Sequence, residues 1–193
     1  MTWRSVVVYW VLAAALGVHL YGEWSARRPI EDIIDRPREP IVTATASAID
    51  TLVIRRGTLE LRAKKVDDRW MLQSPPGIEV QPDLIAALVD TLTSIPPIEI
   101  ISEAGADEAA GPTAGPHNEN QFGLDPPLFE VRLDAGPRTV DTVELGARNP
   151  TRTAVYAKLE SADTLYLLGL NAQYYVELIY EQVDRQLAGA RQG

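Results

Sequence analysis

Residues 51–73 read TLVIRRGTLELRAKKVDDRWMLQ, and this stretch decides which fold the sequence predicts. Two turn signals divide it, Arg56-Gly57 and Asp67-Asp68, and aspartates in a turn accept hydrogen bonds from the local backbone. The segments between the turns alternate in polarity or are rich in β-branched residues, which favours strands. The stretch therefore predicts three antiparallel strands, over residues 51–56, 58–63 and 69–73.

A helix is predicted next. Pro82 suits a first turn, and Pro96-Pro97 ends the segment. Between them, apolar residues recur at helical spacing: Leu84, Ile85, Leu88, Val89, Leu92 and Ile95. Residues 98–101 predict a short strand after the helix.

The second half repeats this order. Alternating segments separated by Gly, Pro and Asp turns predict a meander of four strands, over residues 128–133, 139–145, 153–159 and 164–168. Asn171 is expected to cap a closing helix that carries a Glu181–Arg185 ion pair. Strands, helix, strands and helix predict an α+β fold of antiparallel sheet, with each helix covering one sheet face. One sheet and two sheets remain alternatives.

The amino-terminal segment predicts a membrane anchor. Residues 6–21 are almost uninterruptedly apolar, and a helix of about 20 residues spans a bilayer. Trp3, Tyr21 and Trp24 would anchor the two interfaces with the lipid bilayer. We expect a single-pass protein of the bacterial inner membrane, with a cytoplasmic amino terminus and a periplasmic domain. The alternative is a cleavable signal peptide, because small residues lie at positions 13 and 15.

The sequence predicts one folded domain joined to a membrane anchor by a linker. We expect a transmembrane anchor with its flanks at 1–28, a linker at 29–48, and an extracytoplasmic domain at 49–188. Residues 104–120, rich in Gly, Ala, Pro and acidic residues, predict a flexible loop, and residues 189–193 a tail.

The charge balance excludes one class of partner. The chain carries a net charge of −9, and residues 1–28 carry +2, so the remainder carries −11. Such an acidic domain would be repelled by the phosphates of nucleic acid, so no nucleic-acid partner is expected. The chain has no cysteine, which excludes disulfides and every cysteine-based site.

Several turn-forming and aromatic residues carry a family resemblance. They are Trp70, Pro75-Pro76, Pro82-Asp83, Pro96, the Phe122-Gly123-Leu124-Asp125 segment with Pro127, and Gly146. Over residues 49–187 their spacing resembles the domain of unknown function numbered 4340. The resemblance implies a single-span envelope protein, often encoded beside gliding-type ABC transporter components, and it implies no reaction.

Catalytic residues are scarce. His117 lies in the predicted loop, without the rigid surroundings that a general base needs. The nearby acidic residues Glu103, Asp107 and Glu108 lack the spacing of a calcium loop. Phosphate-binding loops, nucleophile elbows and zinc-helix motifs are missing from the sequence. We therefore expect no enzyme, no metal and no dedicated small-molecule substrate.

His19 is a candidate ligand inside the predicted span. A polar ring within a membrane helix is a functional candidate. Ala15 lies one helical turn before it, which resembles the way antenna helices present a magnesium ligand to a chlorin. Although no cofactor is otherwise expected, His19 could ligate a bacteriochlorophyll or a haem. The simpler alternative is a histidine that reaches water near the headgroups.

Five tyrosines crowd the last third of the chain, and most are expected in the core. Tyr174 and Tyr180 could instead form a docking surface, because interfaces favour tyrosine. We expect a non-catalytic accessory subunit that docks on, and stabilises or organises, a larger inner-membrane complex. Its partners would be integral membrane subunits of an ABC-type transporter or of a photosynthetic or respiratory complex. The alternatives are the His19 pigment or haem site and a periplasmic module that binds lipid, glycan or peptide.

Overall fold

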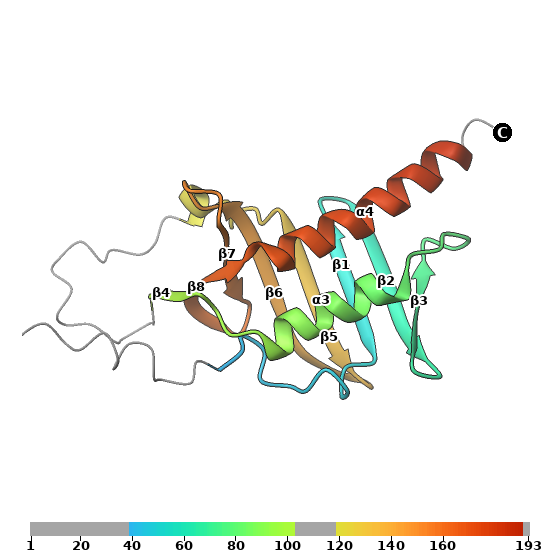
Figure 1. Cartoon of the computed structure of the whole chain (residues 1–193), viewed down its shortest axis with the longest axis horizontal. Helices are drawn as coiled ribbons and strands as arrows, with labels where there is room; N and C mark the ends of the chain where they lie inside the picture. Colours follow the sequence, from blue (N-terminus) through green and yellow to red (C-terminus); the bar gives the residue numbers. More distant parts are fainter. Residues whose placement is uncertain (1–38, 103–118, 191–193) are drawn as a thin grey trace, which may run out of the picture. The chain divides into compact units, whose positions relative to one another are not determined.

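The computed structural model describes residues 39–102 and 119–190. Within them, eight strands form one antiparallel sheet in the order β3-β2-β1-β5-β6-β7-β8-β4 (Figure 1). The strands are β1 Thr51–Arg56, β2 Leu59–Val66, β3 Arg69–Ser74, β4 Glu99–Ser102, β5 Phe129–Ala135, β6 Arg138–Arg148, β7 Ala154–Leu159 and β8 Ala162–Gly169. The helices are α3 Pro82–Ser94, the 3₁₀ helix η1 Glu119–Phe122 and α4 Leu170–Ala190.

The sheet joins two meanders, β1-β2-β3 and β5-β6-β7-β8, and all their hairpins are antiparallel. Strands β1 and β5 pair directly, with Leu52 opposite Leu133 and Ile54 opposite Val131. This pairing places the apolar residues of both meanders on the same face of the sheet. The structure confirms the predicted α+β class, the three strands at the start of the domain and the later meander. Of the two alternatives, one sheet or two, it shows one sheet.

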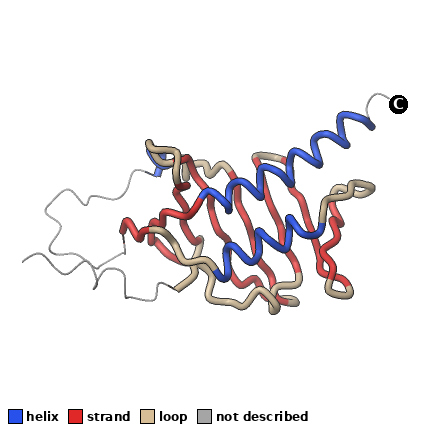
Figure 2. Tube along the Cα trace, in the orientation of Figure 1, coloured by secondary structure: helices blue, strands red, loops and turns tan. Residues whose placement is uncertain are grey.

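Both α-helices cover the same face of this sheet, side by side (Figure 2). The predicted antiparallel sheet with two helices that cover it is therefore confirmed, and both helices share one face (Figure 2). Two side chains of α4 bind the segment that leads into α3. Gln182 Oε1 accepts a hydrogen bond from the Gln81 N–H at 3.0 Å, and Gln186 Oε1 accepts one from the Glu79 N–H at 3.0 Å. The side chain of Gln81 makes no cap of its own, and the two bonds from α4 satisfy the amides of Glu79 and Gln81, which lead into α3.

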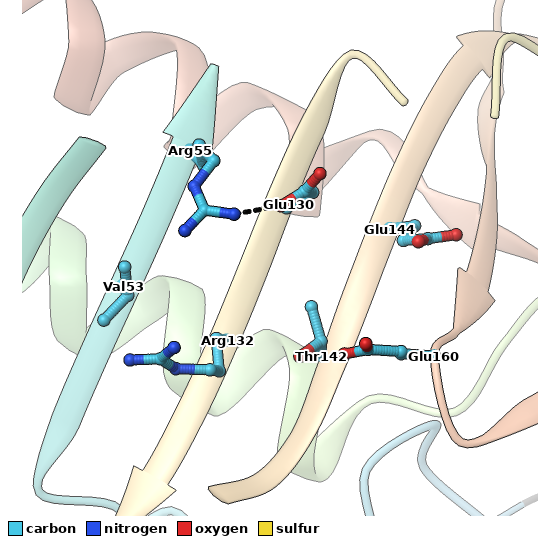
Figure 3. Close-up of a pocket in the computed structure, with 7 residues that line it drawn as sticks. All are labelled: Val53, Arg55, Glu130, Arg132, Thr142, Glu144 and Glu160. Atoms are coloured by element: carbon cyan, nitrogen blue, oxygen red, sulfur yellow. Dashed lines mark hydrogen bonds and ion pairs between the residues drawn. The ribbon is translucent and has the colours of Figure 1, made fainter. Parts of the chain in front are cut away.

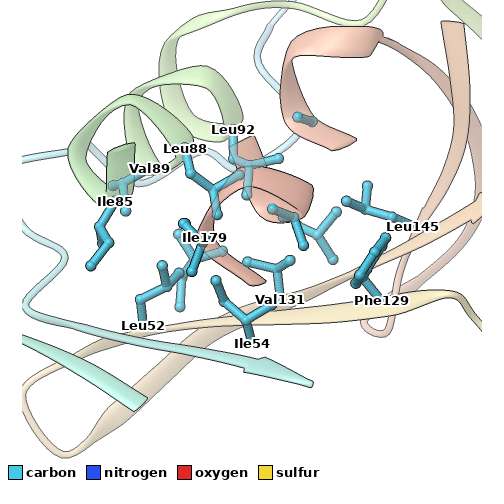
Figure 4. Close-up of a cluster of buried hydrophobic side chains, with 14 of the residues drawn as sticks. Leu52, Ile54, Ile85, Leu88, Val89, Leu92, Phe129, Val131, Leu145 and Ile179 are labelled. Carbon is cyan, nitrogen blue, oxygen red and sulfur yellow. The ribbon is translucent and has the colours of Figure 1, made fainter. Parts of the chain in front are cut away.

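The core lies between the sheet and the two helices (Figure 4). The sheet contributes Leu52, Ile54 and Val131, and α4 contributes Ile179. Helix α3 contributes the residues that recur at helical spacing in the sequence: Ile85, Leu88, Val89 and Leu92. The apolar stripe of α3 therefore faces the core as its periodicity predicts.

Tyr180 is part of this core, and its ring is fully buried. Its hydroxyl shares its proton between the carbonyl oxygens of Ile54, at 3.1 Å, and Leu59, at 3.0 Å. The guanidinium of Arg56 lies 4.2 Å from the ring centroid and pairs with Asp184 at 2.8 Å. Tyr180 therefore joins α4 to the β1–β2 hairpin, and the prediction that it belongs to a docking surface is wrong.

Three expectations at element ends also change. Ile41 and Val42 are buried, and the Val42 N–H donates to the Leu92 carbonyl oxygen at 3.3 Å, so the packed domain includes residues assigned to the linker. Asn171 does not cap α4, because β8 runs directly into a helix that begins at Leu170. Of the predicted loop at 104–120, Glu119 and Asn120 lie in η1, and the rest lies outside the described residues.

Candidate functional site

The face of the sheet without helices is polar. Strand pairing brings charged residues of neighbouring strands opposite one another, with Arg55 opposite both Glu60 and Glu130, and Glu144 opposite both Glu130 and Lys158. Alternate residues of a strand point to opposite faces. The apolar residues that flank these charged residues along each strand therefore face the core. We call this charged surface the open face.

Arg55 lies at the centre of an ion-pair network on the open face. Its guanidinium is 3.0 Å from Glu60 and 3.0 Å from Glu130. The hydrogen bond from Arg55 lowers the pKa of Glu60, and the two carboxylates together raise the pKa of Arg55. The same guanidinium thus links β1 to both of its neighbours, β2 and β5.

A groove of about 350 Å³ crosses the open face beside this network (Figure 3). Strands β1, β5 and β6 and the turn after β7 build it. It is lined by Val53, Arg55, Glu130, Arg132, Thr142, Glu144 and Glu160. The groove is open and mainly polar, so it lacks the apolar walls expected of a lipid site.

Three charged groups in and beside the groove have unfavourable surroundings. Arg132 Nε and Asp134 Oδ1 lie 3.3 Å apart, but both atoms are buried and neither forms a hydrogen bond with a described residue. Burial raises the pKa of Glu144, and the nearby carboxylates of Glu119, Glu130 and Glu160 add to this effect against the attraction of Lys158. Arg132 and Asp134 thus each keep one buried atom without a hydrogen bond, and Glu144 lies among like charges.

One end of the open face is held by η1. Glu119 accepts a bond from Lys158 at 2.7 Å, and the rings of Phe122 and Tyr156 lie 4.7 Å apart at their centroids. A side chain at Gly146 would overlap the carbonyl oxygen of Phe122 and approach Leu124 at 3.0 Å. The structure therefore brings together two parts of the family-like pattern, Phe122-Gly123-Leu124 and Gly146, and gives them a packing role.

Other sequence expectations can be checked in the described residues. Asp67 and Asp68 have positive φ angles, as expected of a tight hairpin turn, and Glu181 pairs with Arg185 at 2.8 Å. Tyr174 is 55% exposed, so docking there stays a prediction. His19, His117, Trp3, Tyr21 and Trp24 lie outside the described residues, and their roles stay predictions.

Within residues 39–102 and 119–190, neither α-helix combines the length and apolar character that crossing a bilayer requires. The predicted span at 6–21 falls outside this part of the chain. The same described residues contain no group of three or more acidic or histidine side chains placed to hold a metal ion.

The groove was not predicted from the sequence. Its charged residues alternate along each strand, as in the Glu130-Val131-Arg132 segment, and this pattern indicates a solvated face. The pattern does not indicate which strands are neighbours, so it could not predict that Arg132 and Glu160 line the same groove.

An α+β domain with one antiparallel sheet and two helices on one face defines the class of this protein. Residues 70–187 match the family model described as Domain of unknown function (DUF4340). The match covers more than half of the chain, so the chain belongs to this family, and the resemblance in the sequence is confirmed. Curated proteins and solved structures yielded no match.

Proposed function

We propose that this chain is a non-catalytic accessory subunit, anchored in the inner membrane, whose folded domain docks on a larger membrane protein complex from the periplasmic side. The apolar segment at 6–21 supports the anchor, and the lack of familiar catalytic motifs supports a role without turnover. The observation that carries the docking role is the difference between the two edges of the sheet.

The β4 edge is aliphatic. Among the described strands, β4 pairs only with β8, and none of them pairs with its other side. Ile100 and Ile101 on β4 are exposed by 41% and 37%, and Ile95 just before the strand is also exposed. An exposed edge with apolar side chains favours a partner that adds a strand to the sheet.

The β3 edge differs in chemistry. Two of its three exposed side chains are polar, and Asp68 pairs with Lys65 in the turn that leads into it. A register shift interrupts the pairing at both edges, so the two edges differ in their side chains: β4 carries one charge, Glu99, beside two exposed isoleucines. Charged and polar side chains at an edge oppose the addition of another strand. Met71 is an exposed apolar residue on β3, the edge at which we expect no partner strand. It therefore provides a matched control for Ile100 on β4.

The test compares Ile100→Glu with Met71→Glu in the full chain. Each protein is purified from native membranes in mild detergent after cross-linking, and cross-linked peptides are identified by mass spectrometry. We expect cross-links from the β4 region to one integral membrane complex in the parent chain and in Met71→Glu, and their loss in Ile100→Glu. Unfolding curves show whether both variants remain folded.

A chain that purifies alone and monomeric would contradict the proposed function. Cross-links that survive Ile100→Glu but are lost in Met71→Glu would move the docking site to the opposite edge. Trypsin accessibility of the folded domain in intact spheroplasts tests its side of the membrane, and protection from the enzyme would contradict the periplasmic assignment.

A further inference from the structure

The groove on the open face has a cationic side and an anionic side. Arg55 and Arg132 come from β1 and β5, whereas Glu144 and Glu160 come from β6 and the turn after β7 (Figure 3). Glu130 lies between them and is bound to Arg55 at 3.0 Å. A ligand that crosses the strands therefore meets opposite charges at its two ends.

The cationic side has hydrogen-bonding capacity to spare. Within the described residues, Arg132 contacts a carboxylate only at Asp134, where the buried Nε lacks a hydrogen bond. A guanidinium carries five N–H donors, so a second carboxylate can bind it. Thr142 lies directly opposite Arg132, is only 9% exposed, and its hydroxyl has no hydrogen-bond partner in the described part of the chain.

The anionic side is also short of partners. Lys158 lies opposite Glu144 and attracts its carboxylate, but the Lys158 ammonium group pairs with Glu119 at 2.7 Å. Burial and the neighbouring carboxylates raise the pKa of Glu144, so a cation placed here would relieve an unfavourable charge. The Glu160 backbone N–H donates to the Thr142 carbonyl oxygen at 2.9 Å, which fixes this turn beside the groove.

We propose that this groove binds a compact zwitterion of the amino-acid type, with its carboxylate on Arg132 and its ammonium group on Glu144 and Glu160. A guanidinium binds a carboxylate through two parallel bonds, and an ammonium group supplies three donors for carboxylates. The Thr142 hydroxyl lies between the two ends and can bond either group. This site is additional to the proposed docking role and does not depend on it.

The dimensions set the size of the ligand. Arg132 stands on β5 and Glu160 follows β7, two strands away, so the ligand must reach across β6 (Figure 3). The groove volume of about 350 Å³ is at the small end of the usual range for small-molecule sites.

Titration of the isotope-labelled full chain in detergent micelles tests the proposal. The probes are glycine, β-alanine and γ-aminobutyrate, which carry the same two charges at increasing separation, with acetate and methylammonium as single-charge controls. We expect one of the three amino acids to bind saturably and to shift the backbone amide signals of Arg132, Thr142 and Glu160. The single-charge probes should bind at least about tenfold more weakly, because each loses one set of charged bonds.

Two variants locate the site. Glu160 is exposed in a turn, so Glu160→Gln should fold normally and lower the affinity by about tenfold. Arg132→Lys keeps the charge but loses the two parallel bonds, and it should weaken binding by a similar factor. Glu181→Gln, an exposed carboxylate on α4, is the matched control and should bind as the parent does.

Three results would overturn the proposal. The first is the absence of saturable shifts with all three amino acids. The second is equal binding of acetate or methylammonium, which would indicate recognition of a single charge. The third is unchanged affinity in the folded Glu160→Gln variant. None of these results bears on partner docking at the β4 edge, so the two proposals can fail separately.

Discussion

The two faces of the sheet are built from alternate residues of the same strands, yet they differ in almost every physical respect. On the covered face, Leu52, Val131 and Ile179 are buried against one another and against α3. On the open face, Arg55 shares its charge between two carboxylates, while Arg132 and Glu144 remain incompletely paired. Burial of apolar surface stabilises a fold far more than exposed ion pairs do. We therefore expect the covered face to determine stability and the open face to be free for recognition.

The largest effect should come from a cavity on the covered face. Ile179 is only 1% exposed and lies between α4 and the sheet, so Ile179→Ala should lower the free energy of unfolding by about 2–5 kcal/mol. Val66→Ala removes apolar volume at an exposed position of β2 and should change it by less than about 0.5 kcal/mol. Urea unfolding followed by circular dichroism measures both. Equal losses would remove the distinction between the faces.

The next effect concerns the contact between η1 and β6. Gly146→Ala would place a Cβ against the carbonyl oxygen of Phe122, which is backbone and cannot rotate away. Such overpacking typically costs about 1–3 kcal/mol. Gly169→Ala, with no atom within 4 Å of the added Cβ, is the control. Thermal unfolding should show a lower midpoint for Gly146→Ala alone, and an unchanged midpoint would mean that η1 does not hold this position in solution.

A smaller effect tests the bond that joins α4 to the β1–β2 hairpin. Tyr180→Phe keeps the ring but removes the hydroxyl that donates to the carbonyl oxygens of Ile54 and Leu59. Both residues also pair within the sheet, so the variant loses one buried hydrogen bond, and the free energy of unfolding should fall by about 0.5–1.5 kcal/mol. Tyr174→Phe alters an exposed hydroxyl and serves as the control. If both variants behave as the parent does, the buried bond is not a source of stability.

Most single elements were predictable from the sequence because their signals are local. The alternation in residues 51–56 and the apolar periodicity of α3 each lie within one element, and the Asp67-Asp68 turn lies between two neighbouring strands. The errors concern relations between elements. Asn171 resembles a helix cap, but β8 continues directly into α4, so the helix needs no capping loop at that point.

The long-range contacts explain why the rest could not be predicted. The Tyr180 hydroxyl bonds to backbone positions 126 and 121 residues earlier in the chain, and nothing near Tyr180 in the sequence identifies them. The groove similarly depends on the β1–β5 pairing, which joins the two halves of the domain. Alternation assigns Arg132 to a face of its strand, but only the sheet order places Glu160 near it.

The smallest expected effects distinguish two carboxylates within the open face. The pKa of Glu60 is lowered by Arg55, so its stabilising contribution is present above the pKa of the unfolded state and is lost as the pH falls through the lower, folded-state pKa. The pKa of Glu144 is raised, mainly by burial, so the folded state keeps a proton that the unfolded state has released. Glu144 therefore lowers stability as the pH rises from the pKa of the unfolded state through the higher, folded-state pKa.

Replacement by glutamine should reveal these opposite signs. Near pH 7, Glu60→Gln should lower the free energy of unfolding and Glu144→Gln should raise it, each by less than about 1 kcal/mol, because solvent screens both groups. As the pH falls from 7, the Glu144 difference should disappear first, because its pKa is raised, and the Glu60 difference last, because its pKa is lowered. Urea midpoints measured across this range decide the matter. A lower free energy of unfolding in both variants would mean that the Glu144 carboxylate is stabilised by a cation in solution. The anionic side of the groove would then already have a cationic partner.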